Sequence, residues 1–173
     1  MNKVIVVLCE GQHDIAFISR VLKANNFLPY NKKIKQFQYP LNSLFEQRLK
    51  AKTISDKKLG FQSDYLIPSV ALNNDTTLVL FHSMGGDARI KEREEVLEMY
   101  QDLSGDDDFS QLDFSLRFII CLDADDVGVS SRLDELAREI GLEDNFEQGK
   151  VIKFNSGFTR KCSEQVISNN NRR

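Results

Sequence analysis

A buried apolar run that ends in closely spaced acids is the feature that most constrains this chain. The segment 118–122, Phe-Ile-Ile-Cys-Leu, is typical of a core strand, and Asp123 and Asp125 follow it directly. Because alternate side chains of an extended chain share one face, these two carboxylates are expected to converge at the carboxyl end of the strand. Paired carboxylates repel each other unless a cation lies between them, and the usual cation is a hard, oxygen-binding ion such as Mg²⁺ or Mn²⁺.

A second acid follows another apolar run near the start of the chain. Residues 4–8, Val-Ile-Val-Val-Leu, give way to Cys9-Glu10-Gly11, and Asp14 then opens a helical pattern. Open α/β sheets bind ligands at the carboxyl ends of their strands. Acids delivered by two such strands therefore predict a shared site, with Glu10 and Asp14 opposite the Asp123 cluster.

Strand and helix patterns alternate along much of the chain. Strands are predicted at 3–8, 65–71, 76–82, 116–122 and 150–154, and helices at 12–24, 41–51, from the glycine pair at 85–86 to about 103, and from 130 to 140. The strands at 65–71 and 76–82 are expected to form a hairpin around Asn73-Asn74-Asp75. We expect an α/β fold with a largely parallel sheet flanked by helices on both faces.

Length and composition favour a single domain. The chain has 173 residues, of which 41% are hydrophobic and 28% charged. We expect one domain over residues 1–154, with an insertion at about 25–77 and a polar C-terminal tail over 155–173.

A cytoplasmic location is expected, because no apolar stretch approaches the roughly 20 residues that span a bilayer and no membrane contact is indicated. Cys9 and Cys121 lie on predicted core strands and are expected to be buried free thiols.

Charge is unevenly distributed although the net charge is only −3. Residues 31–58 carry eight basic and two acidic side chains, whereas residues 87–113 carry three basic and ten acidic ones. A basic stretch of this kind favours contact with a phosphate backbone, and an ordinary solvated face is the alternative. The candidate nucleic-acid contacts are Lys32, Lys33, Lys35, Arg48, Lys50 and Lys52.

The order of these motifs resembles the TOPRIM domain of topoisomerases, bacterial primases, OLD-family nucleases and small stand-alone proteins. The resemblance covers residues 3–24 and 78–154: Glu10-Gly11 after a first strand, a glycine turn after a middle strand, and Leu-Asp-Ala-Asp at 122–125 after a later one. It implies a Rossmann-like TOPRIM-type fold. It also implies that Glu10 is a general acid/base or metal ligand, that Asp123 and Asp125 hold Mg²⁺, and that Asp14 assists as in the nuclease branch. The partner domains of topoisomerases, primases and OLD nucleases have no counterpart in this chain.

The resemblance predicts Mg²⁺-dependent phosphodiester chemistry on nucleic acid, of a nuclease type used in DNA repair or defence, with a partner protein or a homodimer as further expectations. A non-catalytic module that binds a nucleotide or a protein is the alternative from another class.

Other readings of the same residues remain open. The segment 118–127 also fits the haloacid-dehalogenase phosphatase signature, with Asp123 as nucleophile and Asp125 as general acid, but this leaves Glu10 without a role. An EF-hand fits poorly, because Val127 falls where an oxygen ligand is needed. The acids can also serve simply as helix caps and turn residues.

Secondary candidates lie at other strand ends. Asp126 extends the acidic run, and His82 and His13 are candidate general bases. Ser83 with Gly85 and Gly86 is interpreted as a turn that a phosphate approaches closely.

Overall fold

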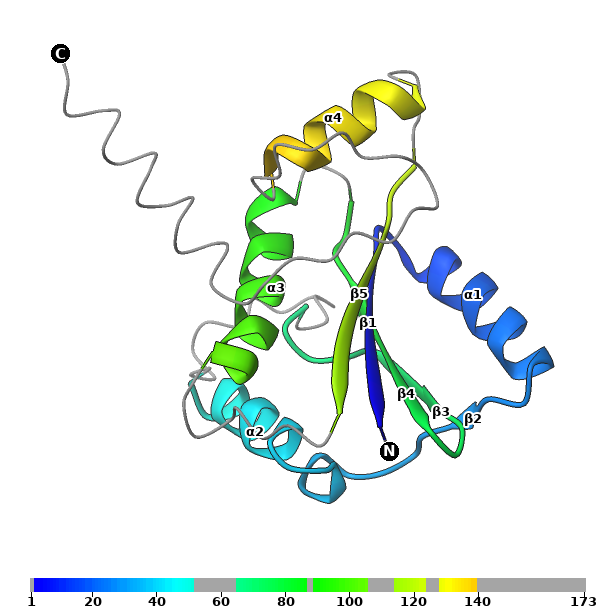
Figure 1. Cartoon of the computed structure of the whole chain (residues 1–173), viewed down its shortest axis with the longest axis vertical. Helices are drawn as coiled ribbons and strands as arrows, with labels where there is room; N and C mark the ends of the chain where they lie inside the picture. Colours follow the sequence, from blue (N-terminus) through cyan, green and yellow to red (C-terminus); the bar gives the residue numbers. More distant parts are fainter. Residues whose placement is uncertain (1, 52–64, 87–88, 106–113, 124–127, 140–173) are drawn as a thin grey trace, which may run out of the picture.

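The computed structural model describes residues 2–51, 65–86, 89–105, 114–123 and 128–139. In that part of the chain, strands and helices form an α/β arrangement (Figure 1). In chain order its elements are β1 (Lys3–Cys9), α1 (Gln12–Ala24), β2 (Leu28–Pro29), the 3₁₀ turn η1 (Ile34–Gln36), α2 (Leu41–Ala51), β3 (Val70–Asn73), β4 (Thr77–Ser83), α3 (Ile90–Gly105), β5 (Ser115–Cys121) and α4 (Val129–Glu139).

The described strands form one mixed sheet in the order β2-β3-β4-β1-β5. β1 pairs in parallel with β4 on one side and β5 on the other, whereas β3 is antiparallel to both β4 and β2. The α/β class predicted from the sequence is therefore confirmed, but the expectation of a largely parallel sheet is not.

The antiparallel part follows from a short turn. The side-chain oxygen of Asn74 accepts hydrogen bonds from the backbone N–H groups of Thr76 and Thr77, at 3.0 and 2.8 Å. This Asx-type turn folds β3 back on β4, as the predicted hairpin requires. The first strand of the hairpin is shorter than the predicted 65–71 and begins only at Val70, just after Pro68, which has no N–H to give to a ladder.

β1 and β4 are interior strands of the sheet, and their sequences are apolar along almost their whole length. Most of their side chains are buried. Val4, Val6 and Leu8 of β1 pack in one hydrophobic cluster, and Val7 and Cys9 pack in a second. Because successive residues point to opposite faces, both faces of these strands are covered.

The two clusters contain residues from different helices, which lie on different sides of the sheet (Figure 1). The first cluster takes Leu41, Leu44 and Phe45 from α2 and a row of residues from α3, among them Val96 and Tyr100. The second takes Ile15, Ile18 and Leu22 from the apolar stripe of α1. The stripe explains why residues 12–24 form a helix with the predicted bounds.

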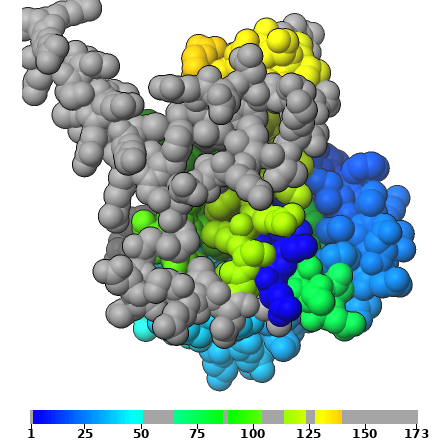
Figure 2. Space-filling model, in the orientation of Figure 1, coloured from blue at the N-terminus to red at the C-terminus, as the bar shows by residue number. Residues whose placement is uncertain are grey.

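β5 is the outer strand of the described sheet. Its residues alternate between exposed and partly buried, and Figure 2 shows its atoms reaching the surface beside β1 and α1. Ile119 is 47% exposed, in contrast to the fully buried Val6 and Leu8 on the neighbouring strand. The predicted strand at 150–154 and the polar tail at 155–173 lie outside the described residues.

The expected insertion at about 25–77 contains β2, η1, α2 and β3, of which β2 and β3 extend the sheet beyond β4. Residues 52–64 lie outside the described part.

None of the described helices is long and apolar enough to cross a membrane.

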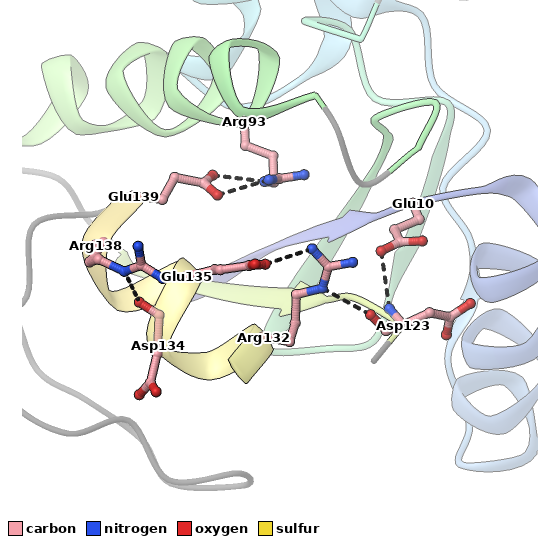
Figure 3. Close-up of polar contacts among 8 residues, drawn as sticks. All are labelled: Glu10, Arg93, Asp123, Arg132, Asp134, Glu135, Arg138 and Glu139. Carbon is pink, nitrogen blue, oxygen red and sulfur yellow. Dashed lines mark hydrogen bonds and ion pairs between the residues drawn. The ribbon is translucent and has the colours of Figure 1, made fainter. Parts of the chain in front are cut away.

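α4 is joined to α3 by a buried ion pair. The Arg93 guanidinium donates to both carboxylate oxygens of Glu139, through Nε at 2.7 Å and through a terminal nitrogen at 2.8 Å (Figure 3). The side chains are only 3% and 5% exposed. Two-point contacts of this kind fix orientation as well as distance, so the pair sets how α4 lies against α3.

Replacing Arg93 with alanine is expected to lower the free energy of unfolding by about 3–5 kcal/mol, because a buried carboxylate then loses its counter-charge. Arg89→Ala is the matched control, since Arg89 pairs with Glu92 at the surface and its side chain is 43% exposed. That change is expected to cost less than about 1 kcal/mol. Urea unfolding measures the free energy of unfolding of both variants. Equal losses in the two would contradict the stabilising role given to the buried pair.

Candidate functional site at the carboxyl ends of the parallel strands

Three parallel strands end at the same level of the sheet. In the ladder, Cys9 at the end of β1 lies opposite Ser83 of β4 and opposite Cys121 of β5. Residues that follow these strand ends therefore meet at one edge, here called the acidic rim, which comprises Glu10, Gly11, Asp14, Leu122 and Asp123. The rim is where the sequence predicted a shared site.

Glu10 and Asp123 are brought into direct contact at the rim. A carboxylate oxygen of Glu10 accepts a hydrogen bond from the backbone N–H of Asp123 at 3.0 Å, although 113 positions separate the two residues (Figure 3). Glu10 is half-buried and Asp123 is exposed. The Asp123 carboxylate points away from this contact (Figure 3), and the residue is exposed.

Arg132 holds the same loop from the other side. Its Nε donates to the backbone carbonyl of Asp123 at 3.1 Å, and a terminal nitrogen donates to Glu135 at 3.0 Å (Figure 3). The Asp123 peptide groups are thus held by a carboxylate at the N–H and by a guanidinium at the C=O. Sequence reasoning missed Arg132. The available signal was a cation in the first turn of α4, where the helix dipole disfavours positive charge unless another contact compensates.

The glycine pair fixes the backbone of Glu10. The N–H groups of Gly85 and Gly86 donate to the Glu10 carbonyl at 2.9 and 3.1 Å, and the N–H of Met84 donates to the Cys9 carbonyl at 2.8 Å. Gly85 and Gly86 have φ values of 82° and 125°, which other residues rarely adopt. The turn was interpreted as a place of close phosphate approach, but in the structure these two N–H groups bind the rim itself.

Asp14 caps the helix that leaves the rim. Its carboxylate accepts the backbone N–H of Gly11 at 3.0 Å, in the first turn of α1. An acid here satisfies a free donor and interacts favourably with the helix dipole. This local contact occupies one of the two carboxylate oxygens of Asp14.

The described part of the rim offers two carboxylates that project from strand ends, those of Glu10 and Asp123. Oxygen ligands of this type suit Mg²⁺, which is commonly held by one or two carboxylates and otherwise by water and substrate. No group of three or more acidic, histidine or cysteine side chains able to hold a metal occurs among the described residues. Asp125 and Asp126, the predicted further acids, lie outside them.

His82 is part of the core and does not open onto the rim. Its ring is fully buried, with Nδ1 2.6 Å from the Tyr65 carbonyl and Nε2 2.9 Å from the Tyr100 hydroxyl. Since a carbonyl can only accept, Nδ1 carries the proton and Nε2 accepts from Tyr100. Burial raises the pKa of Tyr100, so its hydroxyl keeps that proton. His82 therefore has a structural role here, whereas Ser83 is half-buried beside Cys9 and His13 is exposed on α1.

The basic residues lie far from the acidic rim. Lys32, Lys33 and Lys35 lie at and before η1, and Arg48 and Lys50 are on α2. Figure 1 shows these elements near the amino-terminal ends of β1 and β5, whereas the rim is at the opposite end. Lys52 lies outside the described residues. The sequence shows that these basic residues are close together along the chain. It does not show that they lie at the opposite end of the sheet from the acidic rim.

A pair of thiols lies directly below the rim. Cys9 is buried and Cys121 is partly buried, and both are free. The hydrogen bond between them raises the pKa of Cys9, and burial adds to the rise, whereas the same bond lowers the pKa of Cys121. Cys9 is thus the inert buried thiol that the sequence predicted, and Cys121 is more accessible than predicted.

Alkylation is expected to distinguish the two thiols. Because its pKa is lowered, Cys121 should react with iodoacetamide at a lower pH in the folded protein than in the urea-unfolded protein, whereas Cys9 should react only after unfolding. Peptide mapping across a pH series in EDTA measures both, and faster labelling of Cys9 would contradict the expectation.

Gly86→Ala is expected to lower the free energy of unfolding by about 1–3 kcal/mol, because a side chain at φ 125° is strained. Gly11→Ala is the matched control: Gly11 is extended, at φ −142°, and an added Cβ would meet only the Asp14 carboxylate at 3.9 Å. It should cost less than about 1 kcal/mol. Thermal and urea unfolding measure the free energy of unfolding of both variants. A larger loss of that free energy in Gly11→Ala than in Gly86→Ala would contradict the predicted strain of a side chain at position 86.

No known protein family, curated protein or solved structure gives a significant match to this chain. Its function is therefore inferred from the geometry of its own residues.

Proposed function

We propose that this protein carries out metal-dependent phosphodiester chemistry on nucleic acid, as a nuclease-like domain of TOPRIM type. The observation that carries the proposal is the contact between Glu10 and the Asp123 backbone. It joins the ends of two strands that are distant in sequence, and the carboxylate of the exposed Asp123 points away from the contact (Figure 3).

The fold supports the proposal at the level of its central strands. β4, β1 and β5 form a parallel core with hydrophobic clusters on both faces, and the acids follow β1 and β5. We infer that this core is the TOPRIM-type, Rossmann-like unit, and that β2 and β3 are an antiparallel addition at its edge. On this view the parallel, helix-flanked sheet expected from the sequence corresponds to the core alone.

The chain's own residues have distinct roles in this chemistry. Asp123, with Asp125, would hold Mg²⁺ or Mn²⁺, and the bound ion would neutralise charge on the phosphate. Glu10 would transfer a proton to or from the reacting oxygen, since it is half-buried and lies beside the acid loop. Arg132 is a positioning residue, because it binds the Asp123 carbonyl and so orients the backbone of Asp123.

The test is cleavage of labelled single- and double-stranded DNA and RNA with Mg²⁺, Mn²⁺ or EDTA. Glu10→Gln and Asp123→Asn are each expected to reduce metal-dependent cleavage by about a hundredfold or more, the usual effect of losing a general acid/base or its metal ligand. The matched control is Asp134→Asn, since Asp134 is an exposed acid of α4 whose side chain points away from the rim (Figure 3). It should cleave like the wild type.

Circular dichroism and urea unfolding establish that each variant is folded. Cleavage by Glu10→Gln and Asp123→Asn at the wild-type rate would overturn the proposed residue roles. A wild type that binds nucleic acid without cleaving it under any of these conditions would identify the non-catalytic binding module instead.

A further inference from the structure

A second cavity lies at the other edge of the sheet, away from the acidic rim. It has a volume of about 410 Å³, is formed around β2 and β3, and includes Lys23, Tyr30, Lys32, Phe37, Ile67 and Leu72 among its walls. We call it the β2–β3 pocket. Its size falls within the range of sites that take small organic ligands.

One wall of the pocket is aromatic and firmly anchored. The rings of Tyr30 and Phe37 meet edge to face with centroids 4.9 Å apart, and Phe37 meets Phe45 in the same way at 5.5 Å. Phe45 is fully buried, so this row of rings is rooted in the core. The Tyr30 N–H also donates to the Ala71 carbonyl of β3 at 2.9 Å. Tyr30 itself is half-buried, so part of this aromatic side chain is accessible.

The charge on the pocket is of one sign. Among the residues that the structure describes, its lining contains Lys23 and Lys32 and no acidic side chain. The Lys32 ammonium lies over the Tyr30 ring, 5.1 Å from its centre, so the positive charge and the aromatic side chain are neighbours in the wall of the pocket. A cavity of about 460 Å³ between α3 and α4 is different, because Arg93 and Arg132 there are paired with Glu139 and Glu135. The β2–β3 pocket is therefore the one suited to an anion with a flat apolar body.

We propose that the β2–β3 pocket binds a nucleotide unit, with the base against Tyr30 and the phosphate beside Lys23 and Lys32. The unit is either a free nucleotide or one residue of a single strand, since both present the same base and phosphate. Base stacking on an aromatic ring combined with lysine contacts to phosphate is the usual basis of sequence-tolerant single-strand binding. The site is separate from the rim: α1 begins at the rim and ends beside the pocket, and its 13 residues span about 20 Å.

The experiment measures binding in EDTA, with the full-length chain and two probes. Deoxythymidine monophosphate is titrated by calorimetry, and a labelled oligothymidylate by fluorescence anisotropy. Tyr30→Ala is expected to weaken binding by about fivefold or more, because one stacked base is lost, whereas Tyr30→Phe should keep the wild-type affinity. Phe17→Ala is the matched control, since Phe17 is a 70% exposed aromatic residue on α1 that does not line the pocket.

The lysines are tested by salt dependence. Lys23→Gln and Lys32→Gln should each reduce the slope of log affinity against log salt for the oligothymidylate by about 0.7, the value for one phosphate contact of a single strand. Lys91→Gln, an exposed lysine of α3, is the matched control and should leave the slope unchanged. Lys23 and Lys32 are exposed, so these variants are expected to fold and they test the proposal even if Tyr30→Ala does not fold.

If both probes bind and Tyr30→Ala weakens both, the pocket recognises a single nucleotide. If only the oligothymidylate binds and Tyr30→Ala weakens it, the pocket recognises a strand. A wild type that binds neither probe, or the same affinity in the Tyr30 and lysine variants as in the wild type, would overturn the proposal. Because the binding is measured in EDTA and involves neither metal nor cleavage, its outcome does not depend on that of the nuclease assay. Failure of the nuclease proposal and failure of this one are thereby distinguishable.

Discussion

The pairing of β1 between β4 and β5 is the interaction on which the rest of the structure depends. Because all three strands are parallel and in register, they end opposite one another at Ser83, Cys9 and Cys121. Any residue that follows one of these ends is therefore next to residues that follow the others. The sequence distance between Glu10 and Asp123 becomes irrelevant once the ladder has formed, because this register places Cys9 opposite both Ser83 and Cys121.

Backbone contacts convert this edge into a defined rim. Gly85 and Gly86 donate to the Glu10 carbonyl, the Glu10 carboxylate accepts from Asp123, and Arg132 donates to the Asp123 carbonyl. Each contact joins a different strand end or helix, so β4, β1, β5 and α4 are all tied to one place. The buried pair of Arg93 and Glu139 holds the far end of α4 against α3. Much of the polar chemistry at this edge thus serves to position two acids, which is the pre-organisation that a catalytic or metal-binding site requires.

The acidic rim carries negative charge, whereas the β2–β3 pocket carries positive charge. Carboxylates collect at the carboxyl ends of the parallel strands, and the lysines of the pocket lie at the antiparallel edge. A nucleic acid that uses both places would keep its backbone charge near Lys23 and Lys32 and present one phosphate at the acids. On the function proposed above, this separation would keep the rim carboxylates away from phosphates that are bound but not cleaved.

Local patterns in the sequence were enough to predict most of the longer described elements and to single out the candidate acids. The apolar runs at 3–8 and 116–122, the stripe of Ile15, Ile18 and Leu22, and the turn at Asn74 depend on neighbouring residues alone, and each appears in the structure. Tertiary structure decided the rest, because partners that are distant in sequence leave no local periodicity. It turned His82 into a core residue by placing Tyr65 and Tyr100 on either side of its ring, recruited Arg132 to the rim, and set the basic segment at the opposite end of the sheet. Chain neighbours determine where strands and helices form, whereas strand order determines which side chains meet.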